Sequence, residues 1–151
     1  MKTLTVSLAM IATLAASPAY SELYRHTLHD GRDPFTLPRT KTDWVPSSIP
    51  GVPAPRTQCQ YMHSKVIIVI EGNPIQDAKK AAESCVREGL AKGMTAAVLT
   101  AIGTGGAGAV EAGVTVATGY IGDCLSSHVP AAATPKIKIE NPTGWGNWGG
   151  C

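Results

Sequence analysis

The sequence predicts an α+β fold, in which a disulfide-stapled antiparallel helical hairpin is inserted between two antiparallel strands. Four of the six residues 103–108 are glycine, and this density costs too much backbone entropy for a helix to continue. The chain should therefore reverse direction there. Two cysteine pairs and two strand-like runs are arranged symmetrically about this stretch. The pairs are Cys85 with Cys124 and Cys59 with Cys151, and the runs are residues 65–71 and 136–140.

Residues 1–21 have the features of a secretory signal peptide. The basic residue Lys2 precedes the apolar segment 4–16, and the small residues Ser17, Ala19 and Ser21 that follow suit cleavage after Ala19 or after Ser21. The apolar segment is too short to span a bilayer, which disfavours the alternative of a retained membrane anchor. We therefore expect a secreted or periplasmic protein whose remaining residues form one domain. In an oxidising compartment its four cysteines would be paired.

Residues 22–58 are expected to form a Pro-rich, irregular and extended arm that precedes a disulfide-linked domain at 59–151. Proline has no amide N–H and restricts the backbone, so it interrupts helices and central strands. The prolines of the arm are Pro34, Pro38, Pro46, Pro50, Pro53 and Pro55.

The first strand is predicted over residues 65–71, because Val66–Ile70 is β-branched throughout and indicates burial on both faces. Asn73 is a good helix N-cap, and Pro74 suits the first position of a helix. The predicted elements that follow are a helix over 74–102, a Gly-rich turn over 103–108 and a helix over 109–127.

Small residues recur every four positions along both predicted helices, which places them on one face of each helix. Such a seam lets two helices approach closely, and a disulfide requires Cα atoms about 4.4–6.8 Å apart. The seam and a bridge between Cys85 and Cys124 therefore support each other. The expected seam residues are Gly89, Gly93, Ala97, Ala109, Gly113 and Ala117.

Residues 136–140 alternate between charged and apolar side chains, which is typical of a half-buried strand. Because a helical hairpin leaves and returns at the same end, this strand should pair antiparallel with residues 65–71. That pairing brings Cys59 and Cys151 together for the second disulfide.

Composition and motifs disfavour several functions. The 13 Lys and Arg residues against 11 Asp and Glu form no basic stripe, so nucleic-acid binding is not expected. Gly103, Gly105 and Gly108 fit G-x-G-x-x-G, but a dinucleotide site also needs further βαβ units.

One polar cluster in the arm is more typical of a loop than of a metal site. It consists of His26, His29, Asp30 and Asp33. No catalytic residue, metal or cofactor is predicted, and we do not expect an enzyme.

The uncharged residues 93–110 favour a helical hairpin over one straight membrane span, because glycines cluster at their middle. The hairpin resembles the glycine-zipper segments of some secreted membrane-active proteins. Helices of mostly small residues offer little side-chain volume for a water-exposed core, whereas small seams pack well in lipid. We therefore expect a secreted membrane-active protein, bacteriocin-like or pore-forming, whose hairpin tip carries Glu111 into a bilayer.

The alternative is a soluble, disulfide-stabilised secreted or periplasmic module that has a binding or structural role without membrane activity. Its partner would be another protein chain, including a second copy, in place of a lipid bilayer. Trp145 and Trp148 lie between glycines in the tail. We expect their rings to cover the sheet, and the alternatives are a membrane-interface anchor and a sugar-stacking surface.

Overall fold

The computed structural model describes residues 20–75, 77–129 and 135–151, so the predicted signal peptide, residues 1–21, lies almost entirely outside the described part. The strands are β1 (Ser21–Arg32), β2 (Arg39–Pro46), β3 (Pro53–Gln60), β4 (Met62–Gly72), β5 (Lys136–Glu140), β6 (Thr143–Trp145) and β7 (Gly149–Gly150). The helices are α1 (Ala78–Ala91), α2 (Met94–Thr104), the 3-10 turn η1 (Gly106–Gly108) and α3 (Ala109–His128).

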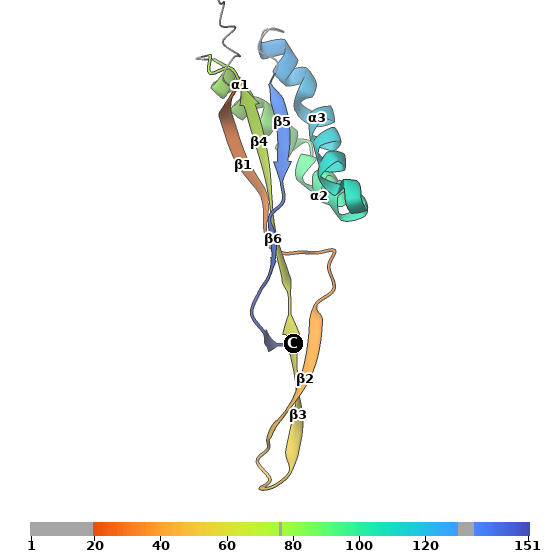
Figure 1. Ribbon diagram of the computed structural model, residues 1–151. Coiled ribbons are helices and arrows are strands. Elements are labelled where there is room, and N and C mark those ends of the chain that lie inside the picture. Colours follow the sequence, from red (N-terminus) through yellow and green to blue (C-terminus); the bar gives the residue numbers. More distant parts are fainter. Residues whose placement is uncertain (1–19, 76, 130–134) are drawn as a thin grey trace, which may run out of the picture.

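The strands pair antiparallel and form two sheets. The first sheet has the order β1-β4-β5, with β6 pairing to the beginning of β4, and the second has the order β2-β3-β7. Figure 1 shows that the helices lie beside the first sheet, whereas β2 and β3 form a hairpin that projects away from them. The molecule therefore has a helix-covered body and an uncovered extension.

The predicted α+β class is confirmed, and so is the antiparallel pairing of the two predicted strands. Ile68 lies opposite Ile139, and Ile70 lies opposite Ile137. Alternate residues of a strand point to opposite faces, so these isoleucines share the face that packs against the helices. The helices contribute Ala82, Cys85, Val86, Met94, Val98, Ala117 and Ile121 to the same core.

The expectation of an irregular arm at residues 22–58 is wrong, because most of this segment is β-structure. Ser21–Arg32 contains no proline, and as β1 it pairs along nearly the whole of β4. In the second sheet the prolines occupy positions that tolerate them: Pro46 and Pro53 form the last pair of the hairpin. Pro55 lies beyond the short contact of β3 with β7, where β3 is an edge and needs no further N–H.

A single helix over residues 74–102 is also wrong, because this segment contains two helices. α1 begins at Ala78, after Asp77, and the predicted cap at Asn73 is not used. Gly93 has a φ of 89°, a left-handed conformation that glycine adopts at low cost, and it separates α1 from α2. The helix predicted over 109–127 agrees with α3 to within one residue.

Candidate functional site

Both predicted disulfides are present. Cys85 and Cys124 join α1 to α3 with a Cα–Cα distance of 5.7 Å, and Cys59 and Cys151 join β3 to the C-terminal segment at 5.0 Å. The ring of His128 lies within 4.8 Å of the first pair, but the sulfurs of a disulfide are not thiolate ligands. The bridges indicate an oxidising, extracytoplasmic setting.

The predicted seam residues do not form one continuous line of helix–helix contact. A Cβ on Gly89 would lie 2.7 Å from Ile121 Cγ2, and one on Gly113 would lie 3.0 Å from Ile102 Cγ1. Large side chains thus fill the space that these glycines leave. Ala117 is fully buried, and Ala97 and Ala109 are half-buried. Gly93 has no atom within 4 Å of its Cβ position, so the prediction that Gly93 contacts another helix in the seam is wrong.

The turn between α2 and α3 is partly covered. A Cβ on Gly103 would lie 2.5 Å from the ring of Phe35, so the connection between β1 and β2 folds over this end of the helices. Glu111 is exposed in the first turn of α3. Within the described residues, no helix combines the length and apolar character needed to cross a membrane.

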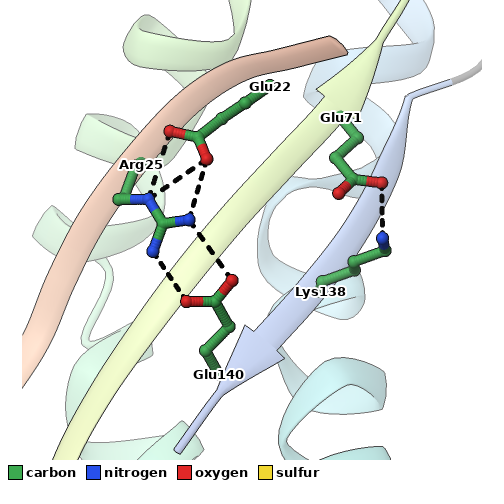
Figure 2. Close-up of polar contacts among 5 residues, drawn as sticks. All are labelled: Glu22, Arg25, Glu71, Lys138 and Glu140. Atoms are coloured by element: carbon green, nitrogen blue, oxygen red, sulfur yellow. Dashed lines mark hydrogen bonds and ion pairs between the residues drawn. The ribbon is translucent and has the colours of Figure 1, made fainter. Parts of the chain in front are cut away.

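The face of the first sheet that points away from the helices carries a cluster of ion pairs (Figure 2). Arg25 of β1 reaches across β4, with nitrogens 2.8 Å from Glu22 and 2.6 Å from Glu140. The hydrogen bond from Arg25 holds the pKa of Glu22 below its ordinary value of 4.5. A third ion pair joins Lys138 to Glu71 at 2.6 Å.

These charged side chains cover two apolar residues on the outward face of β4. Ile67 is only 8% exposed and Val69 only 2% exposed, although the helices lie on the opposite face. Long charged side chains can bury their aliphatic stems over such residues while their charged ends stay in water. Because each of the five charges has an oppositely charged partner, we interpret this cluster as a cover for the sheet.

A small cavity lies beneath the connection between β1 and β2. It has a volume of about 240 Å³ and is lined by Phe35, Ser64, Leu99, Ile102 and Asn141, among others. The side-chain oxygen Oδ1 of Asn141 is buried without a hydrogen-bond partner. The volume is below the roughly 300–1,000 Å³ of typical ligand pockets, and it leaves room for water beside the unpaired Asn141 oxygen.

The most distinctive surface is the tip of the β2–β3 hairpin, residues 44–55. This segment carries no charged side chain, yet it is extensively exposed. Trp44 is 69% exposed, Ile49 62% and Val52 51%. Apolar side chains gathered at the end of a projecting element are typical of a surface that contacts a partner or a membrane.

Several polar groups of the tip are hydrogen-bonded within it. The hydroxyl of Ser47 donates to the carbonyl of Val52 and accepts from the N–H of Ile49 at 3.1 Å. The N–H of Val52 donates to the carbonyl of Ile49 at 3.2 Å. Four further positions are prolines and have no N–H; they are Pro46, Pro50, Pro53 and Pro55. These hydrogen bonds and prolines reduce the number of hydrogen bonds to water that the tip would lose on leaving water.

The two tail tryptophans pack against cations at the base of the hairpin. Arg39 lies 4.0 Å from the centre of the Trp145 ring, and the Lys41 ammonium lies 5.1 Å from the Trp148 ring. Such cation–π contacts fix the direction of the basic side chains. They follow from the disulfide at Cys59, which holds the tail beside β3.

Sequence reasoning missed the hairpin, although a signal was present. Residues 39–43 contain no proline and alternate charged residues with threonine, and Pro50-Gly51 is a turn signal. Gly51 has a φ of 79°. The proline content obscured this pattern. The chain matches no protein-family model, no curated protein and no solved structure.

Proposed function

We propose that this is a secreted or periplasmic membrane-binding protein that inserts the tip of its β2–β3 hairpin into the interface of a lipid bilayer. The observation that carries the proposal is the tip itself, which is uncharged, exposed and internally hydrogen-bonded. This proposal keeps the membrane activity expected from the sequence, but it assigns insertion to the β2–β3 hairpin in place of the helical hairpin.

Physical chemistry favours this element. In a bilayer each unsatisfied backbone polar group costs several kcal/mol, and the prolines and internal hydrogen bonds of the tip reduce their number. Trp44 is suited to the membrane–water boundary, where tryptophan is enriched. The helical turn offers mostly Gly and Ala at residues 103–109, and Phe35 covers part of it.

Co-flotation of the oxidised protein with liposomes tests the proposal. The wild type should float with lipid, and Trp44→Ala or Ile49→Ala should each weaken binding by roughly tenfold, because each removes much of one buried apolar side chain. Leu37→Ala is the matched control. Leu37 is 85% exposed but lies outside the tip, so its truncation should leave binding unchanged.

A second variant separates the two routes of insertion. If the helical hairpin entered the bilayer, Glu111→Gln would strengthen binding, because it removes a charge from the inserted part. Docking by the β-hairpin predicts no effect of this substitution. Absence of flotation with every lipid composition would contradict the proposal. Retention of a protein partner that depends on Trp44 would then indicate a protein-binding module.

A further inference from the structure

Three basic side chains share one face of the hairpin just beyond its apolar tip, because residues 39, 41 and 43 lie on the same side of β2 and Arg56 is paired with Asp43. Arg56 follows Pro55, which is paired with Trp44, while Lys41 and Arg39 precede Trp44 by three and five residues. We call Arg39, Lys41 and Arg56 the basic collar. Asp43 is the only acidic residue of the segment 39–60, so this segment has a net charge of +2, from three basic residues and one acidic residue.

Two of the collar residues are free to bind an anion. Within the described residues, no carboxylate oxygen lies within 4.0 Å of the cationic nitrogens of Arg39 or Arg56, whereas Lys41 pairs with Asp43 at 3.0 Å. The contact of Arg39 with the Trp145 ring leaves the edges of the guanidinium accessible. Guanidinium groups bind phosphate through two parallel hydrogen bonds, and a planar group held in place loses less entropy on binding.

When the tip is inserted, Arg56 and Lys41 lie near the lipid headgroups, whereas Arg39, five residues from Trp44, lies about 16 Å above Trp44 and outside the headgroup layer. Successive strand residues are about 3.3 Å apart. Measured along the hairpin from Trp44 toward the body of the protein, Arg56 therefore lies about 3 Å and Lys41 about 10 Å away. The headgroup layer on each side of a bilayer is about 5–8 Å thick. With Trp44 at the boundary of the hydrocarbon, Arg56 lies within this layer and Lys41 lies just outside it.

We propose that the basic collar selects anionic phospholipid headgroups, so that the hairpin docks on negatively charged membranes in preference to zwitterionic ones. This inference rests on the membrane docking proposed above. The apolar tip supplies insertion, Arg56 and Lys41 contact or approach the headgroups, and Arg39 adds positive charge that acts on the membrane surface across about one Debye length.

The test compares binding to phosphatidylcholine vesicles with binding to vesicles that also contain phosphatidylglycerol. The wild type should bind the anionic vesicles more tightly, and added salt should reduce the difference by screening. Lys41→Gln and Arg56→Gln should each weaken binding to anionic vesicles by roughly fivefold, the effect of about one surface charge. Neither should change binding to phosphatidylcholine. Lys80→Gln on α1 removes the same charge far from the collar and should have no effect.

The outcomes separate the two proposals. Equal binding of the wild type to both vesicle types, with Trp44→Ala defective on both, would overturn the role of the collar and leave docking by the tip intact. Loss of affinity in Lys80→Gln equal to that in Arg56→Gln would also overturn it, because the effect would then reflect net charge alone. Binding to neither vesicle type would overturn both proposals.

Discussion

At the scale of single residues, the glycines of the helices have different roles that depend on what a side chain would meet. A Cβ on Gly89 would lie 2.7 Å from Ile121 Cγ2 and 3.1 Å from Met94 Sδ, whereas a Cβ on Gly119 would meet nothing within 4 Å. Both residues lie inside helices, where glycine is less favourable than alanine. Of these two residues, only Gly89 has a packing reason to be glycine.

We therefore expect Gly89→Ala and Gly119→Ala to have opposite effects on stability. Gly89→Ala should lower the free energy of unfolding by about 1–3 kcal/mol, because Ile121 and Met94 are fully buried and must move. Gly119→Ala should raise it by about 0.5–1 kcal/mol through better helix propensity. Denaturant unfolding of both variants measures the difference, and effects of the same sign would contradict this account of the packing.

The ion pair of Glu22 predicts a change of stability with pH. The pKa of Glu22 is lower in the folded protein than its ordinary value of 4.5, first because Arg25 donates a hydrogen bond to it. The folded state therefore binds this proton less readily than the unfolded chain. The stabilisation is complete above the ordinary pKa and is lost as pH falls through the lower folded pKa.

The measurement is the melting temperature of the wild type and of Glu22→Gln as a function of pH. The wild type should be the more stable near neutral pH, and the difference should shrink as pH falls below 4.5. The effect should be small, because both partners are more than 40% exposed and solvent screens them. Glu111→Gln serves as a control outside this ion pair. A difference for Glu22→Gln that does not vary with pH would count against the interaction.

At the scale of elements, the two disulfides constrain different parts of the molecule. The bridge between Cys85 and Cys124 links two helices of the core, whereas the bridge between Cys59 and Cys151 fixes β7 beside β3. Since β7 is only two residues long, its pairing depends on this bridge.

We expect Cys59→Ser/Cys151→Ser to release the tail while the first sheet stays folded. Amide hydrogen exchange should become faster in residues 146–151 and remain slow in the central residues of β4, which are hydrogen-bonded on both sides. Removal of the bridge between Cys85 and Cys124 should instead lower global stability by up to about 4 kcal/mol, the chain-entropy value for its loop. Uniformly faster exchange in the first variant would show that the bridge also supports the core.

At the scale of the whole molecule, stability and the proposed binding are assigned to different regions. The core lies between the helices and the first sheet, while the hairpin tip is uncovered and projects away from it (Figure 1). Substitutions at the tip should therefore change membrane binding without lowering the melting temperature. A loss of liposome binding in such a variant then reflects the tip and not unfolding.

Much of the fold follows from patterns that lie close together in the sequence. Val66–Ile70 and the alternating residues 136–140 indicate strands, and the glycines at 103–108 locate the reversal between α2 and α3. The common centre of the two cysteine pairs predicts both disulfides. The sequence pattern does not predict β1 or the hairpin, because the prolines between residues 34 and 55 disfavour strands over most of this segment.

The sequence by itself determined the α+β class, the pairing of β4 with β5 and the disulfide connectivity, because β-branched runs, alternation and symmetric spacing are local physical constraints. Tertiary structure decided which glycines receive a neighbour's side chain, where the helix breaks at Gly93, and that Phe35 covers the helical turn. It also decided that the exposed apolar surface belongs to the hairpin of β2 and β3. The reason is that burial is a property of contacts between distant segments: the helices lie along β1, β4 and β5, and none of them covers residues 44–55.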